Sequence, residues 1–290
     1  MHPVLKSLIA GFCAALIMAG GALAAPAMWK VSDGDSEVWL FGSIHVLDET
    51  TEWRTPLLEE VLNKAQIIYY EAFMGEEAQA QVQESTLALG FNPEGVTLTS
   101  LLESDDKELL EKTAQNYGTD MAELENLRPA LASMVLATKA IMKSGYDPKN
   151  GVDKQLSAET PDLKERYFES LEKQLLMLAD LPQDAQIEML VSGLHQLEAG
   201  PEFFHTLIEN WQMGDVDELE EILNEDVEDD APEVYDALFR KRNEAWAEEL
   251  STLMAGDEDA LIVVGTAHLV GNDSVPELLE ERGLTVERVQ

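Results

Sequence analysis

The feature that most constrains this sequence is a short motif that occurs near both ends of the chain. Residues 38–48 read VWLFGSIHVLD, and residues 261–271 read LIVVGTAHLVG. In each, an apolar run that is typical of a buried strand ends at a glycine, and a histidine follows three residues later. The glycine indicates a backbone conformation that other residues resist, and it would let a ligand approach closely. We therefore expect Gly42–His45 and Gly265–His268 to form two similar turns at strand ends.

Similar elements follow the two motifs. Residues 56–65 read PLLEEVLNKA, which predicts an amphipathic helix, and residues 66–73 read QIIYYEAF, which predicts a strand. After the second motif, residues 276–283 read PELLEERG, a helix opened by proline and closed by glycine, and residues 284–289 read LTVERV, a closing strand. Each set resembles a strand–helix–strand unit, in which a right-handed crossover joins parallel strands.

These units predict an α/β fold, in which two repeated strand–GxxH–helix–strand units form one central sheet. Both GxxH turns would lie at the carboxyl ends of strands, the edge where open α/β sheets bind ligands. A hairpin should open the fold, because MWKV and EVWLFG flank the turn sequence 33–36. Between the units, roughly residues 76–253 read as amphipathic helices, including 163–180. We therefore expect a large helical insertion within one domain that spans residues 25–290.

The N-terminal segment predicts a secretory signal peptide over residues 1–24. A basic residue precedes the apolar run SLIAGFCAALIMAGGALA, whose small-residue ending places cleavage after Ala24 or Ala25. An uncleaved membrane anchor is the alternative. Cys13, the only cysteine, lies in this segment, so the mature chain would have no disulfide and no thiolate metal site. A cysteine-free secreted chain of this size indicates a bacterial periplasm, with no stable membrane insertion after cleavage.

Acidic residues strongly outnumber basic ones. The chain has 57 Asp and Glu against 19 Lys and Arg, and its formal net charge is −38. Such a field repels nucleic acid and anionic membrane surfaces, so we expect neither as a partner. A solvated acidic surface explains this composition better than a specific acidic function. The charge therefore excludes classes of partner but does not identify the chemistry.

His45 and His268 are the strongest candidates for chemistry. A single histidine in a globular chain is usually structural, but two in the same turn after matching strands indicate a shared role. If the two units pair, both imidazoles converge on one cavity, where neutral imidazole is a ligand for Zn, Mn, Co or Fe. Gly42 and Gly265 would line the same cavity and let the cofactor approach the backbone.

Glu71 and Arg242 are the other candidate site residues. Glu71 ends the second strand of the first unit, which we expect beside the strand that carries Gly42. An unpaired buried carboxylate is costly, so Glu71 either turns to solvent or serves as a metal ligand or general base. Two histidines and one glutamate would leave open positions on a metal, as hydrolysis requires. Arg242 could hold a carboxylate, stabilise an oxyanion or pair with acids on the surface.

The remaining polar candidates are expected to be structural. Asp153 in GVDKQL could cap a helix, support a ligand or bind a metal, and capping is the expected role. His195 and His205 fall in helical patterns without a matching partner. The sequence contains no His-Glu-x-x-His, no Gly-x-Ser-x-Gly, no phosphate-binding glycine-rich loop and no Gly-x-Gly-x-x-Gly, so the corresponding enzyme classes are not indicated.

In these motifs and in their order, the chain resembles the TraB/GumN family, which is related to the Tiki metalloproteases. The resemblance spans nearly the whole mature chain. Besides the paired GxxH motifs and YYEAF, it includes GVDKQL, FESLEKQLLMLADLPQDAQIEML, WQMGDVDELEEIL, RKRNEAWAEEL and VVGTAHLVGNDSVPELLEERGLTVERV.

The resemblance implies a periplasmic protein with a Tiki/TraB-type α/β fold. Tiki relatives are divalent-metal-dependent peptidases, with Mn or Co as the favoured metals. The family's two GxxH turns correspond to Gly42–His45 and Gly265–His268, its acidic strand-end residue to Glu71 and its arginine to Arg242. Glu169 falls where related chains carry the glutamate of Leu-Glu-Thr, but Phe and Ser flank it here, which counts against a role for Glu169 in the site.

The function expected from the sequence is hydrolysis of a peptide bond, with a peptide or protein substrate. His45, His268 and Glu71 would hold a divalent ion (Mn, Co or Zn), or Glu71 would act as general base, and Arg242 would stabilise the attacked carbonyl oxygen. Two alternatives stay open. A non-catalytic periplasmic binder would sequester a secreted peptide or a metal complex in the same cavity. A structural or polysaccharide-export accessory would need the helical surface but not the histidines.

Overall fold

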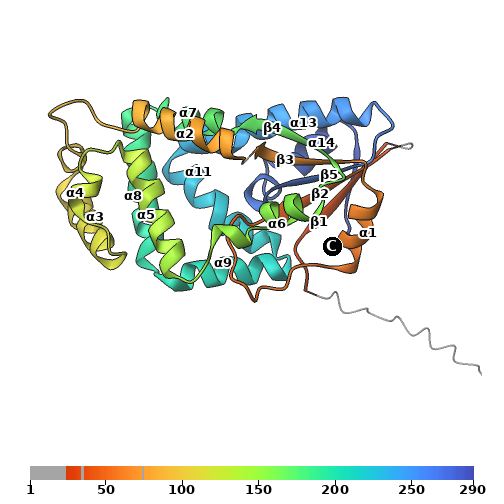
Figure 1. The fold of residues 1–290 in the computed structure, drawn as a ribbon, viewed down its shortest axis with the longest axis horizontal. Coiled ribbons are helices and arrows are strands. Elements are labelled where there is room, and N and C mark those ends of the chain that lie inside the picture. Colours follow the sequence, from red (N-terminus) through yellow and green to blue (C-terminus); the bar gives the residue numbers. More distant parts are fainter. Residues whose placement is uncertain (1–23, 34–35, 74) are drawn as a thin grey trace, which may run out of the picture.

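The computed structural model describes residues 24–33, 36–73 and 75–290. They form a mixed α/β fold, in which a six-stranded sheet lies to one side of a mostly helical region (Figure 1). Residues 1–23 of the expected signal peptide, including Cys13, and two residues of the expected hairpin turn lie outside the described residues. The strands are β1 (Met28–Ser32), β2 (Glu37–Ser43), β3 (Ile67–Phe73), β4 (Lys164–Ser170), β5 (Ala260–Gly265) and β6 (Thr285–Arg288).

Helices fill most of the chain between β3 and β5. None of those in the described ranges is both long and apolar enough to cross a membrane. The α-helices are α1 (Pro56–Lys64), α2 (Glu76–Leu89), α3 (Ser104–Asn116), α4 (Met121–Leu124), α5 (Pro129–Lys143), α6 (Val152–Glu159), α7 (Leu171–Ala179), α8 (Gln183–Glu198), α9 (Pro201–Met213), α10 (Val216–Glu220), α11 (Asp226–Asp230), α12 (Pro232–Tyr235), α13 (Lys241–Met254) and α14 (Val275–Glu281). The 3-10 turns are η1 (Leu98–Leu101), η2 (Pro148–Asn150) and η5 (Thr266–His268), and the π-helical turns are η3 (Glu221–Glu225) and η4 (Asp236–Arg240).

The strand order, β4-β3-β5-β2-β1-β6, interleaves the two ends of the chain. β5 pairs in parallel with β2 on one side and with β3 on the other. The expectation that the strand of Glu71 lies beside the strand of Gly42 is therefore wrong, because β5, which carries Gly265, lies between them. The crossover through α1 leaves a gap between β2 and β3, and β5 occupies it. Because β4 also pairs in parallel with β3, four adjacent strands end at one edge of the sheet.

The helices that follow the two GxxH turns begin with the same local chemistry. Thr55 caps α1 by accepting a hydrogen bond from the N–H of Leu58, and Ser274 caps α14 by accepting one from the N–H of Glu277. Each helix also has a proline in its first turn, which fixes φ and lacks an N–H that would otherwise have no helical partner. These caps end the loops that carry the histidines and turn the chain back along the sheet.

The expected opening hairpin is confirmed, since β1 and β2 pair antiparallel. The closing strand β6 pairs antiparallel with β1, at the edge of the sheet away from β4. The sheet therefore has a parallel part, β4 to β2, and an antiparallel edge formed by β1 and β6.

The expectation of a helix over 163–180 is wrong for its first part, where the chain forms β4, and α7 begins only after that strand. Aromatic contacts across the ladder favour the strand. Tyr167 stacks on Tyr70 with ring centroids 6.3 Å apart, and Phe168 lies 5.0 Å from Tyr69. Because β4 is an edge strand, its charged residues Lys164, Glu165 and Arg166 stay near solvent, and this pattern resembles the surface of a helix.

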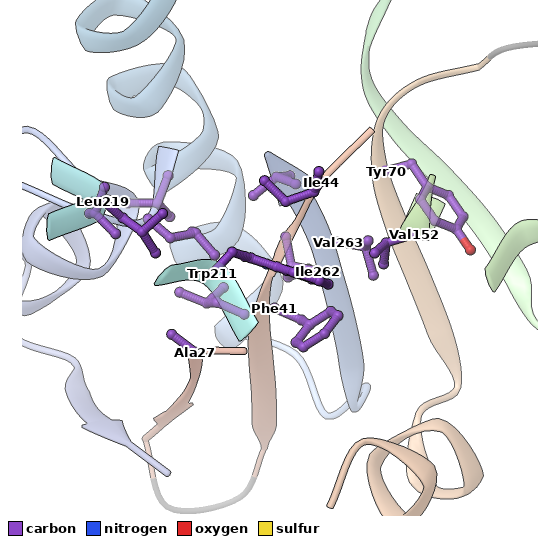
Figure 2. Packing of buried hydrophobic residues seen from close by; sticks show 14 of the residues in the cluster. Ala27, Phe41, Ile44, Tyr70, Val152, Trp211, Leu219, Ile262 and Val263 are labelled. Atoms are coloured by element: carbon purple, nitrogen blue, oxygen red, sulfur yellow. The ribbon is translucent and has the colours of Figure 1, made fainter. Parts of the chain in front are cut away.

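One hydrophobic cluster joins the sheet to the helical region and supports the first GxxH turn. Figure 2 shows Trp211 of α9 beside Phe41 of β2 and Ile262 of β5. Trp211 is fully buried, and its indole Nε1–H donates a hydrogen bond to the carbonyl oxygen of Gly42 at 2.9 Å. The helical region is therefore tied directly to the residue that opens the first motif.

Trp211→Phe should lower the free energy of unfolding by about 1 kcal/mol more than Trp39→Phe does. Both changes shrink a buried tryptophan, but only Trp211 loses a hydrogen bond, the one to Gly42. Urea unfolding of the two variants at one pH measures the difference. Equal losses would contradict a stabilising role for the Trp211 bond.

Candidate functional site

Four side chains gather at the carboxyl edge of the sheet, one from each of the four parallel strands. Glu169 lies near the end of β4, and Glu71 lies near the end of β3. His268 closes the turn η5 directly after β5, and His45 follows β2. Adjacent parallel strands end side by side, so the sheet brings together residues that are far apart in the sequence.

The Glu71 carboxylate is the centre of this cluster. Its Oε1 accepts a hydrogen bond from the backbone N–H of Gly265 at 2.7 Å. The same oxygen lies 3.7 Å from Nε2 of His45 and 3.8 Å from Nε2 of His268. Burial alone would raise the pKa of Glu71, but the positive charges of His45 and Arg242 and the hydrogen bond from Gly265 favour the ionised form, and the pKa falls to about 2. Glu71 is therefore an ionised carboxylate that faces both imidazoles.

The two motif glycines are needed for space and not for an unusual backbone. Neither Gly42 nor Gly265 has a positive φ, so the expectation of a special backbone conformation is wrong. A β-carbon on Gly265 would lie 3.0 Å from Oε1 of Glu71 and 3.5 Å from Nε2 of His45. A β-carbon on Gly42 would lie 2.8 Å from Oγ1 of Thr266. A side chain at Gly265 would therefore fill the gap between carboxylate and imidazole, and one at Gly42 would push the two turns apart.

Asp153 holds His45 at Nδ1, the ring nitrogen that does not face Glu71. Its Oδ2 accepts a hydrogen bond from Nδ1 of His45 at 2.8 Å, and its Oδ1 accepts one from Oγ of Ser43 at 2.5 Å. The expected capping role is wrong: the N-cap of α6 is Gly151, and the buried Asp153 carboxylate pairs with the imidazole instead. The charge of Asp153 raises the pKa of His45 to about 9, so the metal-free imidazole is cationic at neutral pH.

Arg242 is buried in the first turn of α13 and contacts three of the four strand ends. Its Nη2 donates to Glu71 at 2.8 Å, its Nε to Glu169 at 3.0 Å and its Nη1 to Nε2 of His268 at 3.0 Å. Nη1 also donates to the Leu238 carbonyl in the π-helical turn η4 at 2.9 Å. A guanidinium has five N–H donors. One N–H of Nη2 therefore has no partner among the residues that the structure describes.

Glu169 is part of the cluster, although its altered motif counted against such a role. Its side chain is 1% exposed and pairs with Arg242 and, at 3.4 Å, with Lys173. Gln174 donates from Nε2 to Glu71 at 3.2 Å and lies 3.5 Å from Glu169. Successive side chains of a strand point to opposite faces, so the changed neighbours do not move Glu169 away from the arginine.

His268 is far more enclosed than His45. Its ring centroid lies 4.4 Å from that of Trp246 and 5.4 Å from that of Phe239. Nδ1 lies 2.6 Å from Oδ1 of Asn243. Burial lowers the pKa of His268 to about 3, so this imidazole is neutral where His45 is charged.

A cavity of about 170 Å³ opens beside the cluster. The His45 side chain, which is 57% exposed, is its most accessible polar group. A cavity of roughly 150 Å³ is large enough for benzene, so this one fits a side chain or a peptide unit. The lining residues are His45, Tyr70, Glu71, Ala72, Asp153, Leu171 and Gln174.

The donor atoms suit a divalent metal in type, but they are only partly free to bind one. Nε2 of His45 and Oε1 of Glu71 face each other, whereas Arg242 occupies Nε2 of His268. Within the described part of the chain, no three His, Cys, Asp or Glu side chains are arranged to hold one ion. His45 and Glu71 are therefore the residues that fit a metal best.

Two polar residues of the cluster, Gln174 and Asn243, were not singled out from the sequence as site residues. Isolated amides in helices carry no recognisable pattern, and the nearest signal is that Asn243 directly follows Arg242. The two histidines expected to be structural lie elsewhere. His195 is exposed near an acidic residue of its own helix, and His205 hydrogen-bonds to a tyrosine.

Comparison with known proteins gives one match. The model of the TraB/PrgY/gumN family matches residues 27–288, which is nearly all of the described chain. No curated protein and no solved structure matches. The resemblance seen in the motifs is therefore confirmed at the level of the family.

In metal-free protein, the pKa of His45 should be about 9 and that of His268 about 3, as measured by NMR titration of the imidazole C–H signals. Asp153→Asn should return the His45 pKa towards 6.5. Because folding raises the pKa of His45, its stabilising contribution is complete below pH 6.5 and is lost as the pH rises through about 9. A His45 pKa near 6.5 in the unsubstituted protein would contradict the Asp153 anchor.

Glu169→Ala should lower the free energy of unfolding by about 3 kcal/mol, because it removes one acceptor from the buried charge of Arg242. Glu198→Ala is the matched control. Glu198 pairs with Lys112 at the surface, so its removal should cost less than about 1 kcal/mol. Urea unfolding at constant pH measures both, and similar costs would mean that the Arg242–Glu169 pair stabilises no more than a surface pair.

Proposed function

The chain belongs to the TraB/PrgY/gumN family, and we propose that it is a divalent-metal-dependent hydrolase of peptide bonds that acts in the periplasm through its paired GxxH turns. One observation carries the proposal. His45 and His268 direct their Nε2 atoms at the same carboxylate oxygen of Glu71, at 3.7 and 3.8 Å. Imidazole and carboxylate donors converge there beside a cavity, as a hydrolytic site requires.

His45 and Glu71 would hold the ion, with His268 beside them. When bound, a divalent ion supplies Lewis acidity and lowers the pKa of a water molecule. Glu71 is ready for this role because its pKa of about 2 keeps it ionised. His45 is protonated in the free protein, so it would have to release its proton to bind a cation.

Arg242 is the group that fits the negative charge that develops on a substrate. Its remaining Nη2–H would donate to the carbonyl oxygen of the bond under attack. Glu71, Glu169 and the Leu238 carbonyl already fix the guanidinium, so little reorganisation is needed when that charge appears. A preorganised donor of this kind typically contributes about 10²–10³-fold in rate.

A second function, retention of a peptide without cleavage, is favoured by a different observation. Arg242 occupies Nε2 of His268, and the described residues offer no ready set of three metal ligands. In a protein without bound metal, cationic His45 and Arg242 lie on either side of Glu71. Such a pair would attract a carboxylate of a peptide.

Addition of Mn, Co or Zn to metal-free protein should raise the midpoint of thermal unfolding and start cleavage of a peptide library, as followed by mass spectrometry. A metal at 100 times its Kd stabilises the folded state by about 2.7 kcal/mol. His45→Ala and His268→Ala should each reduce cleavage by at least ~10²-fold. His195→Ala is the matched control, because its exposed side chain lies outside the cluster, and it should cleave normally.

The two candidate functions give different products. Shortened peptides support hydrolysis, whereas an intact peptide recovered with the protein supports retention. If no metal changes thermal unfolding and both His45→Ala and His268→Ala behave like the unsubstituted protein, the hydrolase proposal is wrong. Circular dichroism of each variant confirms that a loss of cleavage is not a loss of folding.

A further inference from the structure

Two consecutive residues of α13 hold the imidazole of His268 from opposite sides. Nδ1 lies 2.6 Å from Oδ1 of Asn243, and Nε2 lies 3.0 Å from Nη1 of Arg242. All three side chains are buried, with His268 3% exposed and Asn243 1% exposed. Because water has so little access to the ring, these two contacts decide which nitrogen carries the proton.

The backbone at Asp273 determines which way the Asn243 amide faces. Nδ2 of Asn243 donates to the carbonyl oxygen of Asp273 at 2.8 Å. A carbonyl oxygen can only accept, so the NH₂ group must lie on that side and Oδ1 must face His268. The opposite orientation would place two acceptors against each other at Asp273. Nδ1 of His268 therefore has to carry the ring proton and donate it to Asn243.

Arg242 leads to the same assignment independently. A guanidinium has donors and no acceptor, so Nε2 of His268 must meet it with a lone pair. The other tautomer would set two N–H groups against each other at the Arg242 side and two acceptors at the Asn243 side. It would lose both hydrogen bonds of a buried ring at once.

We propose that Asn243 is a positioning residue that holds His268 as the tautomer protonated on Nδ1 and so keeps the Nε2 lone pair directed at the site. A role of Asn243 in catalysis rests on the proposed function, in which Nε2 of His268 faces the ion beside Glu71. With the proton on Nε2, His268 could neither accept from Arg242 nor bind a cation. Asn243 therefore acts on the site through His268, without touching a substrate.

The two GxxH histidines share this arrangement, although their surroundings differ. Each is anchored at Nδ1 and presents Nε2 to Glu71. The anchor of the exposed His45 is the carboxylate of Asp153, whereas the anchor of the buried His268 is an amide. An amide suits the second position, since it orients the ring without drawing a second proton onto it beside the charge of Arg242.

The tautomer is measured directly by ¹⁵N NMR of the imidazole nitrogens in metal-free protein at neutral pH, with no substrate. In the unsubstituted protein, His268 should show a protonated Nδ1 and an unprotonated Nε2. Asn243→Leu removes the acceptor at similar size, while Arg242 still favours a lone pair on Nε2. The Nδ1–H signal should therefore lose the downfield shift of a hydrogen-bonded proton, and the share of the Nε2-protonated form should rise. Asn224→Ala is the matched control, because Asn224 is a buried amide that donates to the carbonyl of Ala267 in this turn and to that of Val270 just after it, with no hydrogen bond to the ring among the described residues. It should keep the proton on Nδ1.

Two results would overturn the proposal: an unsubstituted protein with the proton on Nε2, or an Asn243→Leu protein with an unchanged His268 spectrum. The first needs no variant, so misfolding of Asn243→Leu cannot hide it. If the protein cleaves peptides, Asn243→Leu should also lower kcat/KM by about 10–100-fold. The NMR result does not depend on metal or turnover, so a failed hydrolase proposal and a failed tautomer proposal are distinguished.

Discussion

The parallel pairing of β5 with both β2 and β3 is the contact on which the rest of the site depends. Almost every residue of β2 and β5 is buried, so both strands need a covered place in the middle of the sheet. Once β5 fills the gap that the α1 crossover leaves, four strand ends share one edge. Glu169, Glu71, His268 and His45 then lie together because of where their strands stop.

The cluster also shows how charge is accommodated away from water. Ions are costly to bury unless partners replace their hydration. Arg242 lies between two carboxylates, those of Glu71 and Glu169, and Asp153 holds the cationic His45. His268 departs from this pattern, because burial keeps its ring neutral. The acidic surface that gives the chain its net charge of −38 is therefore separate from a centre in which opposite charges are paired.

The parts of the fold and site that could be predicted are those recorded in short stretches of sequence. The duplicated GxxH endings, the carboxylate after IIYY and the arginine on a late helix each have a local pattern, and the structure places all four side chains in one cluster. The strand order, the strand β4 and the role of Asn243 have no local sequence pattern, because each depends on partners elsewhere in the chain. Gly265 shows the difference: its motif was visible, but its physical reason is the carboxylate of Glu71, 194 positions away.

The strand order has a consequence for biosynthesis. The ribosome makes β2, β3 and β4 early, and β5 emerges only after the whole helical region. Until then the edges of β2 and β3 that face each other have no ladder partner, a state that invites pairing with other chains. A nascent chain therefore carries an incomplete cluster beside two open strand edges, and the arrival of β5 both completes the cluster and covers those edges.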